Sequence, residues 1–313
     1  MSGPESKPRT RSRIAAASLR RPPAAEQHSA PVEDHWLEIP ARSMHFDGVI
    51  RLREPADTDL MHVLQMIRDG SYTKPFVIDD GISRSLHFDF RSVQSEMLIE
   101  NPTQLTFAYT RKMMSFLLFN PDPRHIVIVG LGGGSLTRFC YNALPQSRLT
   151  TLEISRDVLA LADLFHIPAN DQRNRVLHAD AADYFGDDDC EDDEPADVVL
   201  IDGCDRWGTA PVFCDASFYA NLRQRMHPDG LLVVNMTGLD NRRAAMLRAA
   251  SEVFTNQQLR VKVRGGNHLL FAFNAPGRII NWSAIQQRAR NLEQRHGLNF
   301  PMFACKLRQG LHS

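Results

Sequence analysis

Short apolar runs alternate with mixed polar segments through the middle of the chain. Apolar runs of four to six residues predict buried strands at residues 125–129, 149–154, 175–179, 196–201 and 231–234. Residues 135–143 predict a helix after the first of these strands, and residues 265–273 predict an antiparallel strand that closes the sheet. A further amphipathic helix is predicted from Ser283 to Arg295. This pattern predicts an α/β fold with a mostly parallel sheet.

The first of these strands runs directly into glycines, at Gly130, Gly132, Gly133 and Gly134. Glycine lets a ligand approach the main chain, and the following helix turns its N–H groups toward the same crevice. Glu153 ends the next strand about 20 residues later, the usual distance to a carboxylate that binds a ribose. Ser135 stands where a dinucleotide fingerprint has Gly or Ala. We therefore expect an adenosine-type ligand with a short charged tail, such as S-adenosylmethionine.

Acidic residues follow two further strands. Asp180 has two interpretations: it accepts from the adenine amine, or it caps the helix that begins near Ala181. Asp202 and Asp205 end a continuous apolar run at the edge where such sheets bind ligands, and a simple Asx-type turn explains them as well.

The whole set of motifs resembles the spermidine synthase family, the aminopropyltransferase branch of the methyltransferase-like fold. The resemblance runs from about Lys74 to Phe273 and rests on these motifs in order: Arg84–Asp89 with Gln94, Phe107–Met113 with Tyr109, Gly130–Gly134, Glu153, Asp180, Asp202-Gly-Cys-Asp205, Ser217–Tyr219 and 228–234.

The resemblance implies a methyltransferase-like doubly wound sheet preceded by a small β-rich N-terminal domain. We expect a disordered basic tail over residues 1–35, the small domain over 36–105, the nucleoside-binding catalytic domain over 106–282, and a C-terminal helix and tail over 283–313. By the same likeness the protein is a homodimer.

The resemblance also implies a reaction, in which an aminopropyl group moves from decarboxylated S-adenosylmethionine to an amine in polyamine biosynthesis. Asp205 would orient the acceptor amine and accept its proton, and Asp202 would support the donor or the following helix. Tyr109 would line the cleft, although an aromatic residue near a helix start is also typical of a core. Gln94 would reach across from the small domain. No prosthetic group is implied.

One departure from the family leaves other functions open. The family carries an acid at the position of Gly133, where it holds the ammonium group of the donor. Without that acid, ordinary S-adenosylmethionine is no longer repelled, because its own carboxylate meets no like charge. Methyl transfer is therefore an alternative, and a non-catalytic nucleoside-binding module is another.

Composition limits the classes of partner and the cellular location that we expect. The 313 residues carry a net charge of −1, which suggests neither a nucleic acid nor a membrane surface as partner. The resemblance implies a small-molecule amine as substrate. Five scattered cysteines without a Cys-x-x-Cys pair indicate a cytoplasmic protein. No spacing typical of metal ligands occurs.

Overall fold

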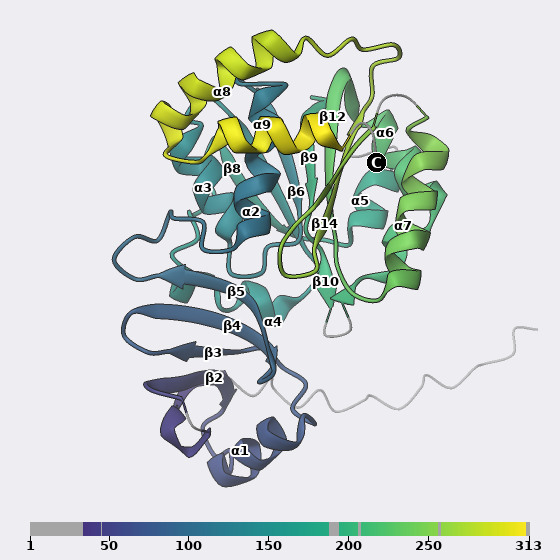
Figure 1. Ribbon diagram of the computed structural model, residues 1–313. Helices are drawn as coiled ribbons and strands as arrows, with labels where there is room; N and C mark the ends of the chain where they lie inside the picture. Colours follow the sequence, from purple (N-terminus) through teal and green to yellow (C-terminus); the bar gives the residue numbers. More distant parts are fainter. Residues whose placement is uncertain (1–33, 45, 188–193, 206–207, 256–257, 311–313) are drawn as a thin grey trace, which may run out of the picture.

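Two sheets follow one another along the chain in the computed structural model (Figure 1). The structure describes residues 34–44, 46–187, 194–205, 208–255 and 258–310. The predicted basic tail, residues 1–35, therefore lies almost entirely outside the described residues. No helix within the described ranges is long and apolar enough to cross a membrane.

The larger sheet has seven strands in the order β13-β14-β12-β9-β6-β7-β8. Five neighbouring strands are parallel: β12 (Met226–Met236), β9 (Ala196–Ile201), β6 (His125–Val129), β7 (Arg148–Glu153) and β8 (Asn174–His178). The antiparallel hairpin β13 (Gln258–Lys262) and β14 (His268–Phe273) completes the sheet beside β12. The chain leaves β6 in one direction through β7 and β8, and returns to its other side at β9. Such a reversal creates a crevice at the carboxyl ends of the strands.

Helices cover both faces of this sheet, which confirms the doubly wound architecture (Figure 1). One face packs against α2 (Ala108–Met113), α3 (Ser135–Ala143), α8 (Trp282–His296) and α9 (Phe300–Gln309). The other face packs against α5 (Ala181–Gly186), α6 (Ala216–Gln224) and α7 (Asp240–Val253). Alternate residues of β6 belong to the two cores, Ile126 and Ile128 to the first, Val127 and Val129 to the second. An apolar residue at every position is what a strand covered on both faces requires.

The smaller, N-terminal sheet is an antiparallel meander of five strands in sequence order. They are β1 (Asp34–Pro40), β2 (Val49–Pro55), β3 (Phe76–Asp79), β4 (Ser83–Asp89) and β5 (Ser92–Leu98). Helix α1 (Leu60–Asp69) packs its apolar side against β1 to β3. A separate cluster joins this sheet to the segment after α4 (Arg156–Leu159), through Val77, Leu86 and Met97 against Leu161 and Phe165. The small domain thereby lies beside the crevice of the large one.

The C-terminal region differs in detail from the prediction. Helix α8 begins at Trp282 because the side chain of Asn281 caps it, accepting from the N–H of Ala284 at 3.1 Å. The prediction placed its start at Ser283. Helix α9, which follows, was expected to be a tail; Asn299 caps it in the same way, with Pro301 in its first turn.

Candidate active site

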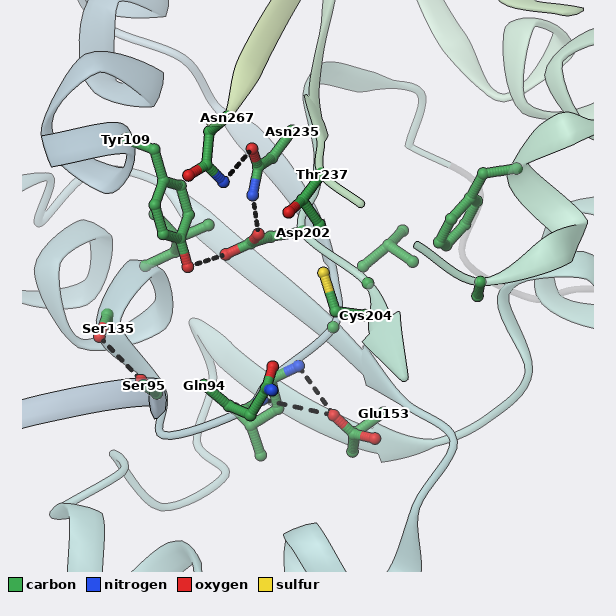
Figure 2. Close-up of a pocket in the computed structure, with 18 of the residues that line it drawn as sticks. Gln94, Ser95, Tyr109, Ser135, Glu153, Asp202, Cys204, Asn235, Thr237 and Asn267 are labelled. Atoms are coloured by element: carbon green, nitrogen blue, oxygen red, sulfur yellow. Dashed lines mark hydrogen bonds between the residues drawn. The ribbon is translucent and has the colours of Figure 1, made fainter. Parts of the chain in front are cut away.

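A cleft with a volume of about 640 Å³ lies at the carboxyl ends of β6, β7, β9 and β12, which is within the usual range for a small-molecule site. The small domain closes one side of it with residues of β5, and the β13–β14 hairpin contributes its turn. Figure 2 shows side chains from these separate elements pointing into the same space.

The glycine turn forms the floor of the cleft at Gly130 and Gly132. Gly130 has φ +93°, and a Cβ there would lie 2.5 Å from the main-chain oxygen of Asp202. Gly132 has φ +51°, and only the Cβ of Ser95, at 3.9 Å, is near the place of its missing side chain. Gly130 therefore allows the ends of β6 and β9 to approach each other closely, and Gly132 leaves the main chain accessible to a ligand.

Gly133 and Gly134, also predicted to bind the donor, do not line the cleft. A Cβ at Gly133 would lie 2.7 Å from Oγ of Ser95 and 3.1 Å from Cδ1 of Phe165. Gly134 has φ +69°, caps α3 and faces Ile167. The position where the family has an acid is therefore enclosed by the small domain and by the segment after α4.

Glu153 lies at the end of β7 and holds the glycine turn. Its Oε2 accepts from the N–H of Leu131 at 2.9 Å and of Gly132 at 3.4 Å, and its Oε1 accepts from Ser155 at 2.9 Å. Oε1 accepts only this one hydrogen bond from the described residues and keeps a second lone pair, so a ribose hydroxyl can still donate to it. Glu153 thus lines the cleft as expected and has a structural part that the sequence analysis did not predict.

Asp180 caps helix α5, which confirms one of its two interpretations. Its Oδ1 accepts from the N–H of Ala182 at 2.8 Å. Asp180 also lines the cleft, and its Oδ2 accepts no hydrogen bond from any residue that the structure describes. The two roles are therefore compatible, and contact with an adenine amine stays a prediction.

The carboxylate of Asp202 lies at the centre of a hydrogen-bonded chain (Figure 2). Tyr109 donates its hydroxyl to Oδ2 at 3.1 Å, and Asn235 donates its amide to Oδ1 at 2.7 Å. Asn267 donates in turn to the side-chain oxygen of Asn235 at 3.0 Å, which fixes the direction of that amide. These hydrogen bonds join α2, the end of β9, the end of β12 and the turn before β14.

Burial raises the pKa of the Asp202 carboxyl above its usual value, although the hydrogen bonds from Asn235 and Tyr109 act against this shift. The same burial, with the charge of Asp202 nearby, raises the pKa of Tyr109 well above its usual value. Tyr109 therefore stays a hydrogen-bond donor. Among the described residues, only neutral groups donate to the Asp202 carboxylate, a state that suits a base.

Asp205 and Gln94 are the remaining two residues predicted to belong to the site. Asp205 is the second residue of the two-residue strand β10 (Cys204–Asp205), which pairs with β11 (Gly208–Thr209). The side chain of Asp205 lies outside the described part of the structure. Gln94 lines the cleft from β5, and its amide donates to Oγ of Ser92 at 3.1 Å.

The sequence analysis missed Asn235, Asn267, Ser95 and Arg264. Asn235 ends a predicted parallel strand, so the rule that found Asp202 would also have found it. Asn267 belongs to the segment 265–273, which was interpreted as a closing strand with its turn, and Arg264 directly precedes that segment. Within the described ranges, no group of three or more His, Cys, Asp or Glu side chains is placed to hold a metal ion.

Comparison with curated proteins finds relatives over most of the chain. The chain is 32% identical over 239 residues to a polyamine aminopropyltransferase of Chromobacterium violaceum, covering 74% of this chain and 88% of that protein. It is 31% identical over 227 residues to the protein of that name from Neisseria meningitidis, with 72% and 85% covered. The eEF1A lysine and N-terminal methyltransferase of Homo sapiens is 26% identical over 195 residues, 57% of this chain and 28% of that protein. No model of a known protein family matches.

Solved structures show the same fold. A probable spermidine synthase from Corynebacterium glutamicum aligns with a TM-score of 0.56 and 20% identity, over 69% of this chain and 84% of that one. Human methyltransferase-like protein 13, in complex with SAH, aligns with a TM-score of 0.55 and 23% identity, over 61% and 93%. At these identities the likeness concerns the fold alone.

Proposed function

Because the chain belongs to the polyamine aminopropyltransferase family, we propose that it transfers the aminopropyl group of decarboxylated S-adenosylmethionine to an amine acceptor. The acceptor nitrogen forms a bond to the carbon beside the sulfonium as the bond from that carbon to sulfur breaks. The nucleoside thioether leaves with the electron pair, and the nitrogen loses one proton. The protein has to place the two reactants in line and to receive that proton.

The observation that carries the proposal is the state of Asp202. It lies at the carboxyl end of β9, beside the glycine turn, with both oxygens turned to neutral donors and a pKa raised by burial. Within the described ranges no cationic group pairs with Asp202, and an unpaired carboxylate has a higher affinity for a proton than one paired with a cation. We assign the proton to Asp202, whereas the sequence analysis assigned it to Asp205, which keeps its predicted part in orienting the acceptor.

The donor would lie along the floor of the cleft. Oε1 of Glu153 would accept from a ribose hydroxyl, and the free oxygen of Asp180 would accept from the adenine amine. The open main chain at Gly130 and Gly132 would face the sulfonium end, and Gln94 would cover the donor from the small domain. These roles follow from the lining of the cleft and from the lone pairs that the described hydrogen bonds leave free.

Methyl transfer from ordinary S-adenosylmethionine is the second candidate, favoured by the surroundings of Gly133. Ser95 and Phe165 fill the space of an acid there, so no carboxylate stands at this position to select an ammonium-bearing donor. Arg138 lies directly behind the turn and donates to the main-chain oxygens of Gly133 and Phe165, without a carboxylate partner in the described part of the chain. Its charge favours a donor that carries a carboxylate. Relatives named as methyltransferases agree with this candidate.

The test is a product assay with each donor in turn and 1,4-diaminobutane and other small amines as acceptors. Mass spectrometry distinguishes an aminopropyl product from a methyl product. The Asp202→Asn variant should lose about a hundredfold or more in rate, because a positioned base contributes on that order. Asp183→Asn, which removes an exposed carboxylate outside the cleft, is the control. Binding of a donor without any product would instead favour the non-catalytic module.

The resemblance also supports a homodimer, and the scattered cysteines support a cytoplasmic location. Both stay predictions.

A further inference from the structure

The turn of the β13–β14 hairpin forms one end of the cleft. The N–H of Val263 donates to the main-chain oxygen of Asn267 at 2.8 Å, which closes a short turn. Within it, Gly265 and Gly266 have φ +99° and +93°, values that favour glycine, and nothing lies within 4 Å of either missing side chain. Val263 is buried and anchors the turn. The turn thereby carries Arg264 to the cleft.

Arg264 is an exposed arginine that lines the cleft. It forms neither an ion pair nor a hydrogen bond with any other residue in the described part of the chain. Two other arginines differ from it: Arg243, on α7, pairs with Asp240, and Arg260, on β13, donates to Gln258 at 3.3 Å. A guanidinium is a planar fork of donors that matches a carboxylate.

The charge around this end of the cleft is positive. Burial is the largest cause that lowers the pKa of His268, which follows the turn, and the charges of Arg243 and Lys262 lower it further, so their field reaches this end of the sheet. Three acids line the cleft among the described residues, and two of them, Glu153 and Asp180, stand at the ends of β7 and β8. These strands lie on the far side of β6 from β12 and β14. The third is Asp202, whose charged form burial disfavours.

We propose that the acceptor amine carries a carboxylate at the end of its chain remote from the attacking nitrogen, and that Arg264 binds this carboxylate. This inference rests on the proposed transfer to an amine and names its substrate class. The nitrogen would face Asp202, and the carboxylate would lie toward the hairpin turn. A diamine would instead bring a second ammonium group against Arg264, and like charges disfavour that arrangement. An amino acid therefore fits the cleft better than a diamine does.

Two four-carbon probes test the proposal, since they differ only in the remote group. 4-Aminobutanoate carries a carboxylate there, and 1,4-diaminobutane an ammonium. Each is titrated by calorimetry into the full chain saturated with 5′-methylthioadenosine, the thioether product. We expect the wild type to bind 4-aminobutanoate about tenfold more tightly, the low end of what hydrogen bonds to a charged group contribute. Arg264→Glu should reverse this preference. Arg260→Glu, the same change on the same hairpin outside the cleft, should leave it intact.

A second arm separates this inference from the proposed function. Both donors are titrated into the wild type and the Arg264→Glu variant. If no donor binds to either protein, the proposed function itself fails. If Arg264→Glu weakens only ordinary S-adenosylmethionine, the carboxylate that Arg264 binds belongs to the donor, and the acceptor proposal is overturned. An equal or stronger preference for the diamine, an unchanged preference in Arg264→Glu, or no binding of either amine also overturns it.

Discussion

Asp202 shows at the scale of one residue how the cleft prepares a base. Burial raises its pKa, while the hydroxyl of Tyr109 and the amide of Asn235 stabilise its charged form. Neither donor carries a charge, so the carboxylate keeps a stronger affinity for a proton than one paired with an arginine would. Asn267 supports this arrangement through Asn235, by turning the amide nitrogen of Asn235 toward Asp202.

The Tyr109→Phe variant tests this balance through the pH profile. The lost hydroxyl donates to the charged carboxylate, so its removal raises the pKa of Asp202 further. A base has to be deprotonated, so activity should fall at a higher pH than in the wild type as the solution is acidified. The measurement is kcat/KM against pH. Tyr141→Phe removes a hydroxyl that donates to Asp171 far from the cleft and should not move the profile. A shift to lower pH would contradict this account of Asp202.

At the scale of elements, the turn between β6 and α3 depends on the strand β5 of the other domain. Oγ of Ser95 lies 3.2 Å from Oγ of Ser135, the first residue of α3, and its side chain occupies the space beside Gly133. Ser95 therefore occupies space that an acidic side chain at position 133 would need.

The Gly133→Asp variant should consequently be destabilised, by about 1–3 kcal/mol as for other overpacked sites. Adding Ser95→Gly removes the nearest clash, at 2.7 Å, and should recover part of the loss, although Phe165 remains at 3.1 Å. Urea unfolding of the wild type, the single variants and the double variant measures this coupling. Strictly additive effects would show that Ser95 does not exclude the acid.

Much of the fold was predictable from local patterns, and the exceptions have physical reasons. The strands β6 and β9 are apolar at nearly every position because helices cover both of their faces. Helix α9 was missed because a proline such as Pro301 usually interrupts a helix. Here Asn299 caps α9 and Pro301 lies in its first turn, where the missing N–H of proline costs no hydrogen bond. The pairing of Tyr109 with Asp202 joins residues 93 positions apart, which no local pattern indicates. The part of Ser95 in enclosing Gly133 likewise depends on how the two domains pack.

At the scale of the whole molecule, a small apolar cluster holds the two sheets together beside the cleft. Phe165 and Leu161 meet Val77, Leu86 and Met97 there. Arg84 adds a polar link, donating to the main-chain oxygen of Leu164 at 2.6 Å and to Asp79 at 2.8 Å. Since β5 forms one wall of the cleft, this contact also determines the shape of the site.

The Phe165→Ala variant should therefore weaken donor binding as well as stability. Loss of this buried ring should cost about 3–5 kcal/mol in the free energy of unfolding. Phe303→Ala removes a ring of α9 buried in the core of the large sheet alone, and serves as the matched control. Urea unfolding should show a loss in both variants, and calorimetry should show weaker donor binding in Phe165→Ala only. Equal donor affinity in the two variants would contradict a structural link between the domain contact and the cleft.

The central claim is that Asp202 is the base of a site for a sulfonium nucleoside. Its most direct test is calorimetric titration of decarboxylated S-adenosylmethionine into the wild type and the Asp202→Asn variant, with turnover measured on the same samples. The account predicts similar affinity in both proteins and loss of aminopropyl transfer in the variant alone. Ordinary S-adenosylmethionine, titrated beside it, tests the methyl-transfer candidate. Absence of binding by either donor, or undiminished transfer in the variant, would contradict the account.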